Sequence, residues 1–199
     1  MILAVDSSGS TGVALVDDGG AVVAMQSSHD PRGHAEAIGP LLEAVLADRV
    51  ADVTAVAYGV GPGPFTGLRV GMAAARTAAM VLGVPELPVL SHDAIALAAL
   101  EGGAAPPFVV VADAKRREVY ATVYRSVDAS GVPVRDGEPT VGALDGVPDL
   151  PRVTAAVDPA VLGRVAALRR AAGIAPEPPD ARYLRSPDVT LAAPKRVTG

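Results

Sequence analysis

The chain has 199 residues, a formal net charge of −5, 50% hydrophobic residues and no cysteine, which excludes a disulfide framework, thiolate metal ligands and a Cys nucleophile. Its apolar stretches fall far short of the ~20 residues that a membrane span needs, and the opening MILAVD has no basic region, so we expect no membrane span, no secretory signal and a cytoplasmic location. Because residues 1–100 carry 4 Lys and Arg against 10 Asp and Glu, the chain is a poor candidate for binding RNA on its own.

The first half of the chain alternates predicted strands and helices. Short β-branched runs separated by Ser, Gly and Asp turns predict antiparallel strands at residues 2–5, 12–16 and 21–25. Helical spacing of apolar residues predicts a helix from about residue 33 to 47, and a strand follows at 53–60. A second helix is expected at 65–82, a short strand at 87–90, and a third helix from Ser91, its expected N-cap, to about residue 100.

The second half repeats one feature of the first. Residues 108–112, Asp113, a polar turn and residues 118–124 have the layout of residues 2–5, Asp6, a polar turn and residues 12–16, although unrelated hairpins also agree over so few positions. A further helix is expected at 158–172, and residues 174–199 hold five of the 18 prolines, which predicts an extended tail. The pattern favours an α/β fold with a first domain at 1–100 and a smaller second domain at 101–199.

The segment GPGPFTGLRVG, residues 61–71, has the composition of a phosphate loop that leads into a helix. The details disagree, because a leucine and an arginine follow Gly67 where a P-loop has Lys and Ser or Thr, and the glycine spacing is GxGxxxG. Pro62 and Pro64 also lack the N–H groups that would bind an anion. A rigid turn that holds Phe65 in place is therefore favoured over an anion site.

The helix after this turn carries small residues at Gly67, Gly71, Ala74 and Ala78, whose spacings of four, three and four place them on one face. Two interpretations remain open. The stripe packs tightly in the subunit's own core, or it lets the helix of a partner approach closely. Under the second interpretation, a large residue at Gly71 leaves the monomer folded and abolishes pairing.

Four segments together resemble the TsaB family. GPGPFTGLRVG is similar to the family's GPGSFTGLRIG, with Pro64 where serine is usual, and MILAVDSSGSTGVAL resembles its opening strand pair. DAKRREVYATVY, residues 113–124, resembles its second-half hairpin, with Arg117 in place of the usual glycine. Tyr183, Leu184 and Arg185 resemble a tyrosine-leucine-arginine element of the family. The first of these matches is specific, and the others would be weak alone.

The resemblance implies an α/β fold of the actin, sugar-kinase and Hsp70 class (ASKHA, RNase H-like), with two duplicated subdomains of which the second is reduced. It also implies a non-catalytic subunit that pairs with a TsaD-like catalytic subunit and a TsaE-like ATPase. Together these transfer threonylcarbamoyl to adenosine 37 of tRNAs that read codons beginning with A. This chain alone would bind no cofactor, ATP and metal would belong to the partners, and tRNA would be reached only through the complex. A homodimer is an open alternative for the isolated chain.

The resemblance also assigns two sets of residues. Partner-binding positions lie on the two helices and on the turn before the second: His34, Ile38, Leu41, Gly61, Gly63, Phe65, Thr66, Gly67, Leu68, Arg69, Gly71, Ala74 and Ala78. Candidates for a vestigial nucleotide site match the hairpin positions near phosphate or metal in that fold class: Asp6, Ser7, Ser8, Thr11 and Asp113. Asp6 also has the ordinary interpretation of a residue that ends a strand at a turn.

No catalytic residue and no metal ligand is expected. TsaD binds metal through an HxxxH motif, but here Ile38 stands four residues after His34, and no other histidine offers a pair. The late double-glycine loop of an adenosine pocket is missing, and neither GxSxG nor HExxH occurs. Two alternatives stay open, namely a stand-alone ATP-dependent phosphotransferase of the sugar-kinase type that uses Asp6 and Asp113, and a metallopeptidase.

The basic residues 115–117 are interpreted as a solvated hairpin tip, with contact to a phosphate or an acidic partner as the alternative.

Overall fold

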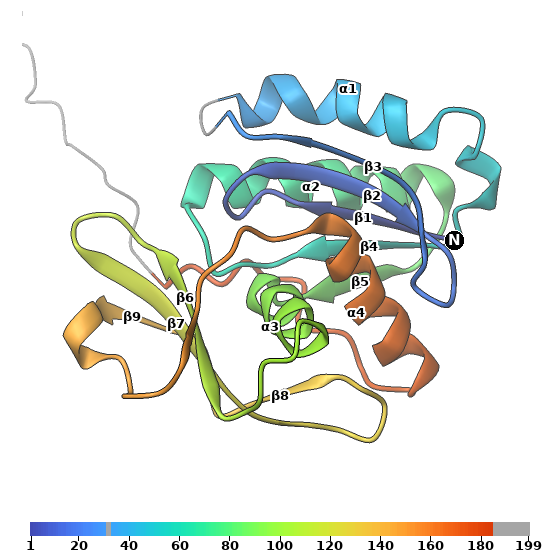
Figure 1. Ribbon diagram of the computed structural model, residues 1–199. Helices are drawn as coiled ribbons and strands as arrows, with labels where there is room; N and C mark the ends of the chain where they lie inside the picture. Colours follow the sequence, from blue (N-terminus) through green and yellow to red (C-terminus); the bar gives the residue numbers. More distant parts are fainter. Residues whose placement is uncertain (31–32, 185–199) are drawn as a thin grey trace, which may run out of the picture.

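A computed structural model describes residues 1–30 and 33–184 of the chain. Up to residue 101, the described residues form a five-stranded sheet and three α-helices (Figure 1): β1 (Ile2–Asp6), β2 (Thr11–Val16), β3 (Val22–Ser28), α1 (His34–Leu46), β4 (Ala55–Gly59), α2 (Phe65–Leu82), β5 (Glu86–Val89) and α3 (Ser91–Glu101). The following described residues add a second sheet and one helix: β6 (Phe108–Asp113), β7 (Glu118–Val127), β8 (Pro133–Arg135), β9 (Thr140–Ala143), β10 (Arg152–Val153) and α4 (Pro159–Ala171).

The first sheet has the strand order β3-β2-β1-β4-β5. The β-branched meander at the start pairs antiparallel, whereas β4 and β5 are reached through α1 and α2 and therefore pair parallel. Helices α1 and α2 cover one face of this sheet, and α4 covers the other (Figure 1). Alternate residues of β1 consequently enter two different cores, Leu3 and Val5 on the α1 and α2 side and Ile2 and Ala4 on the α4 side.

The second sheet repeats the start of the first. Strands β6 and β7 pair antiparallel with Asp113 opposite Val119, as β1 and β2 pair with Asp6 opposite Gly12. Strand β10 pairs parallel with β6, as β4 does with β1. Strands β8 and β9 both pair with β7. The duplicated strand, aspartate, hairpin and strand layout that the sequence predicts is confirmed.

Helices α3 and α4 connect the two sheets. The N-cap of α4, Asp158, accepts hydrogen bonds from Ala160 N at 2.8 Å and from Val161 N at 3.4 Å. Helix α4 packs on the first sheet, although it follows the second sheet in sequence. A Cβ atom at Gly163 would lie 2.9 Å from Val16 Cγ2, so a glycine is required where α4 crosses β2. Buried residues of α3 pack on both the first sheet and the second, which fixes the two against each other.

The predicted helices agree closely with the structure, and α2 has the predicted bounds, residues 65–82. The N-cap prediction for Ser91 is wrong, because Leu90 occupies that position and Ser91 is the first helical residue. Strands β8, β9 and β10 have no counterpart among the predicted elements, since they are two to four residues long and lie among turn-forming residues. In the described part of the chain, every helix is too short or too polar to cross a bilayer.

Candidate functional site

Asp6 joins the turn between β1 and β2 to the start of α3. Its carboxylate is 2% exposed. Oδ1 accepts hydrogen bonds from Ser8 N at 2.8 Å and Ser8 Oγ at 2.6 Å, and Oδ2 accepts one from Ser91 Oγ at 2.7 Å. Burial raises the pKa of Asp6, and the hydrogen bonds from Ser8 and Ser91 oppose that rise. The carboxylate is thus directed into the fold, and Ser91 serves it instead of capping a helix.

Ser7 joins the same turn to α2. Its Oγ donates a hydrogen bond to Gly67 O at 2.7 Å and accepts one from Gly71 N at 3.0 Å. A Cβ atom at Gly67 would lie 2.6 Å from Ser7 O, and one at Gly71 would lie 2.2 Å from Ser7 Oγ. At Gly63 it would lie 2.7 Å from Ser8 O. These three glycines let the turn between β1 and β2 rest directly on the GPGPF segment and on α2.

Thr11 and His34 complete this internal arrangement. Thr11 Oγ1 and His34 Nδ1 form a hydrogen bond of 2.7 Å, which joins β2 to the first residue of α1. Both side chains are buried. Four of the five vestigial nucleotide-site candidates, Asp6, Ser7, Ser8 and Thr11, therefore lie together. Asp6, Ser7 and Thr11 are hydrogen-bonded to other parts of the fold, and Ser8 is hydrogen-bonded to Asp6 within the turn.

The fifth candidate, Asp113, lies across a cleft from this group. The cleft has a volume of about 650 Å³ and is lined by Ser8 and Gly9 on one side, by Asp113 on the other, and by residues at the start of α1 and α2. Asp113 Oδ2 accepts a hydrogen bond from Lys115 Nζ at 2.9 Å, which lowers the pKa of Asp113. Within residues 1–30 and 33–184, no group of three or more His, Cys, Asp or Glu side chains is arranged to hold a metal ion.

The predicted partner-binding residues separate into two groups. The buried group faces the subunit's own interior: His34, Gly61, Gly63, Gly67, Leu68 and Gly71. The other group reaches the surface of α1 and α2, fully or in part: Ile38, Leu41, Phe65, Thr66, Arg69, Ala74 and Ala78. The expectation that a large residue at Gly71 leaves the monomer folded is corrected, because Ser7 occupies the space that such a side chain needs. The partner-binding role itself stays a prediction.

Tyr183 forms a cluster with Phe65 and Arg69 on the surface of α2, and the sequence did not predict this cluster. Its ring centroid lies 4.7 Å from that of Phe65, and its hydroxyl accepts a hydrogen bond from Arg69 Nε at 3.0 Å. The guanidinium carbon of Arg69 lies 4.0 Å from the Phe65 ring centroid. Two of the resemblance motifs, the GPGPFTGLRVG segment and the tyrosine-leucine-arginine element, are therefore in direct contact. Arg185 of that element lies outside the described residues.

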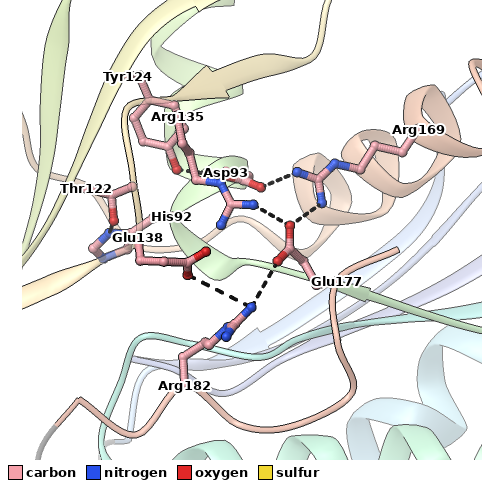
Figure 2. Close-up of polar contacts among 9 residues, drawn as sticks. All are labelled: His92, Asp93, Thr122, Tyr124, Arg135, Glu138, Arg169, Glu177 and Arg182. Carbon is pink, nitrogen blue, oxygen red and sulfur yellow. Dashed lines mark hydrogen bonds and ion pairs between the residues drawn. The ribbon is translucent and has the colours of Figure 1, made fainter. Parts of the chain in front are cut away.

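A buried ion-pair network is the second feature that the sequence did not reveal (Figure 2). The carboxylate of Asp93 in α3 accepts hydrogen bonds from Arg169 Nη2 at 2.6 Å and from the Tyr124 hydroxyl at 2.7 Å. Arg135 Nε lies 3.7 Å from the same carboxylate. Glu177 bridges the same two arginines, with Arg169 Nη1 at 3.1 Å and Arg135 Nη2 at 2.5 Å. A single charge within the apolar run 91–100 is the only sequence signal for Asp93.

The chain is similar to known proteins in sequence and in fold. The family model for TsaD, tRNA N6-adenosine threonylcarbamoyltransferase, matches residues 22–134. An uncharacterized protein of Mycobacterium tuberculosis is 41% identical over 173 residues, which cover 80% of this chain and 78% of that protein. The Escherichia coli tRNA threonylcarbamoyladenosine biosynthesis protein TsaB is 33% identical over 135 residues, which cover 66% of this chain and 57% of that protein.

A solved structure from Pseudomonas aeruginosa, described as an uncharacterized protein with similarity to peptidase YeaZ, superposes with a TM-score of 0.76 at 24% identity. The superposition covers 86% of this chain and 92% of that chain, and at this identity it shows the fold alone. The expected α/β, actin-like fold is confirmed. From the family-model match and the relatives, together with this fold, we conclude that the chain belongs to the TsaB/YeaZ family within the wider TsaD family.

Proposed function

We propose that this chain is a non-catalytic subunit that pairs with a TsaD-like catalytic subunit for the transfer of threonylcarbamoyl to N6 of adenosine 37 in tRNA. In this proposal a TsaE-like ATPase joins the complex, ATP and metal act on the partner subunits, and the assembly is cytoplasmic. The similarity to the Escherichia coli tRNA threonylcarbamoyladenosine biosynthesis protein TsaB supports the pathway. Membership of the wider TsaD family supports pairing between two chains of similar fold.

The engagement of Asp6 inside the fold is the observation that carries the non-catalytic role. A nucleotide or metal site at this hairpin would need the carboxylate to reach the cleft, yet three hydrogen bonds direct it to Ser8 and Ser91. Ser7 and Thr11 are likewise bonded to α2 and to His34. Freeing these groups would leave buried donors without partners, which costs roughly 1–3 kcal/mol for each group.

The outer surface formed by α1 and α2 supports the pairing. Both helices lie on the same face of the first sheet (Figure 1), and their sides away from the sheet are exposed. Met80 and Val81, near the end of α2, are 76% and 75% exposed. If a partner covered these two adjacent apolar side chains, it would remove apolar surface from water, which favours association.

The test is to purify the chain alone and together with the TsaD-like protein of the same genome. We expect negligible ATP hydrolysis by the isolated chain and a heterodimer with the TsaD-like protein by size measurement. Threonylcarbamoyladenosine should form only when the chain, the TsaD-like protein and the TsaE-like ATPase are all present. The size of the isolated chain also decides whether it forms a homodimer. ATP turnover at the rate of a kinase without a partner would instead favour a sugar-kinase-type phosphotransferase and would exclude the proposed role.

A further inference from the structure

The chain after α4 crosses the molecule as an extended segment, residues 174–184, which we term the strap. Glu177 N donates a hydrogen bond to Pro88 O of β5 at 3.0 Å, and Arg182 N donates one to Val60 O at 2.7 Å. Ala181 packs against the core beneath α1 and α2. The strap thus runs from β5 across the end of β4 and reaches α2 at Tyr183.

The ion-pair network holds the strap at its midpoint (Figure 2). Glu177 binds Arg169 of α4 and Arg135 of β8, and its Oε2 lies 3.4 Å from Arg182 Nη2. The Glu177 side chain is only 9% exposed, so these ion pairs are shielded from solvent and from salt. Because Arg182 directly precedes Tyr183, the network fixes the residue that lies against α2.

Tyr183 in turn fixes Arg69 in one orientation. The Arg69 guanidinium is stacked over Phe65 and donates through Nε to the Tyr183 hydroxyl. Among residues 1–30 and 33–184, no carboxylate forms an ion pair with Arg69, although Asp180 lines the same groove. Arg76, two turns further along α2, differs because its Nε is paired with Glu86 at 3.3 Å.

A shallow groove of about 290 Å³ runs between α2 and the strap beside this arginine. Its wall is partly apolar, with Met72 and Ala73 from α2 and Pro179 and Ala181 from the strap. Arg69 stands at the groove with the outer edge of its guanidinium unpaired by any described residue. An arginine whose position is already fixed loses little side-chain freedom on binding, and Arg and Tyr are enriched among residues that dominate interfaces.

We propose that the strap and α2 together form the docking groove for an acidic segment of the partner subunit, with Arg69 receiving a carboxylate. This inference rests on the proposed function and deepens it. It makes Tyr183 a positioning residue that acts through Arg69, and it makes the Glu177 network the support of the interface rather than of the fold alone. A carboxylate is the matching group because the guanidinium fork binds it with two parallel hydrogen bonds.

The test measures the affinity of the purified chain for the TsaD-like protein of the same genome, by calorimetry at two or more salt concentrations. The variants are Arg69→Gln, Arg69→Lys, Tyr183→Phe and Tyr183→Ala. Both substituted side chains are exposed, and circular dichroism verifies that each variant is folded. Arg125→Gln is the matched control, since Arg125 is an exposed arginine of β7 paired with Asp136 on the second sheet. It removes the same charge at a residue that does not line the groove.

We expect Arg69→Gln to weaken binding roughly ten- to a hundredfold and to flatten its salt dependence. The affinities of Arg69→Lys and Tyr183→Ala should lie between those of Arg69→Gln and the wild type. Tyr183→Phe should weaken binding only a few-fold, and Arg125→Gln should bind like the wild type. The proposed docking groove would be wrong if Arg69→Gln bound the partner as tightly as the wild type, or if Arg125→Gln weakened binding as much as Arg69→Gln. A wild-type chain that does not bind the partner at all would overturn the proposed function instead.

Discussion

Ser7 and Gly71 are in direct contact where the turn between β1 and β2 rests on α2. Gly71 N donates a hydrogen bond to Ser7 Oγ at 3.0 Å, and a Cβ atom at Gly71 would lie 2.2 Å from the same oxygen. Ser7 Oγ also donates to Gly67 O at 2.7 Å, so the hydroxyl is held from two turns of the helix. The small residues at this end of α2 are therefore required by packing inside the subunit.

Gly71→Ala should lower the free energy of unfolding by about 1–3 kcal/mol, because the added methyl group must displace Ser7 from its two hydrogen bonds. Urea unfolding of the isolated chain measures this change. Gly71→Leu should prevent folding altogether. A Gly71→Ala variant as stable as the wild type would show that the helix can move away, and the partner-helix interpretation of the small stripe would then regain its support.

Gly39 provides the matched control within the neighbouring helix. It lies inside α1 directly before Pro40, and a Cβ atom there would meet no atom within 4 Å apart from its chain neighbours and the backbone of its own helix. Gly39→Ala should change the free energy of unfolding by less than about 1 kcal/mol, because the gain in helix propensity is opposed by contact of the new methyl group with the Pro40 ring. The difference between the two substitutions separates crowding by Ser7 at Gly71 from a general effect of glycine replacement.

The sequence predicts the elements of this fold well where the signal is local. Apolar periodicity and the flanking Gly and Pro residues are enough for α2, and the paired aspartates are enough for the two hairpins. The contacts between elements are harder, because Ser91 reaches Asp6 over 85 positions and Arg169 reaches Asp93 over 76. A single sequence carries no signal for such pairs, so the internal role of Asp6 and the strap with its ion pairs emerge only from the structure.

Asp6→Ala should destabilise the chain by about 2–4 kcal/mol, since it leaves the amide of Ser8 and the hydroxyl of Ser91 without an acceptor in the interior. Asp6→Asn should cost less, because the amide oxygen still accepts from Ser8. The measurement is thermal or urea unfolding of both variants beside the wild type. If both were as stable as the wild type, the carboxylate would be dispensable for folding, and a role in the cleft would have to be reconsidered.

Asp93→Ala should be among the most destabilising single substitutions, by about 3–5 kcal/mol, because Arg169 and Arg135 would then share only Glu177 as a buried counterion. Arg169→Met in the Asp93→Ala background should recover part of this loss, since it removes the excess buried positive charge and leaves Arg135 paired with Glu177. A double-mutant cycle measures the coupling between the two residues. Additive effects would contradict the direct pairing of Asp93 with Arg169 that Figure 2 shows.

His92 should make the stability of the chain fall as the pH falls below about 6. Its Nδ1 lies 2.8 Å from Thr122 Oγ1, no described residue gives its Nε2 a hydrogen-bond partner, and burial lowers the pKa of His92 to about 3. Below the ordinary histidine pKa of 6.5 the unfolded chain takes up a proton that the native chain excludes, so the native state loses up to ~1.4 kcal/mol per pH unit down to about pH 3. Above pH 7 the effect vanishes, because both states are then neutral at this residue.

The acid sensitivity assigned to His92 is measured as a difference between variants, because Asp6 acts in the opposite direction at low pH. Burial raises the pKa of the Asp6 carboxyl group, so its protonation favours the native state as the pH falls. Urea unfolding at several values from pH 4 to pH 7 should give a shallower slope for His92→Gln than for the wild type. His29→Gln, which removes an exposed imidazole, should keep the wild-type slope. Parallel slopes for the wild type and His92→Gln would mean that His92 is protonated in the native state and that the interior accommodates its charge.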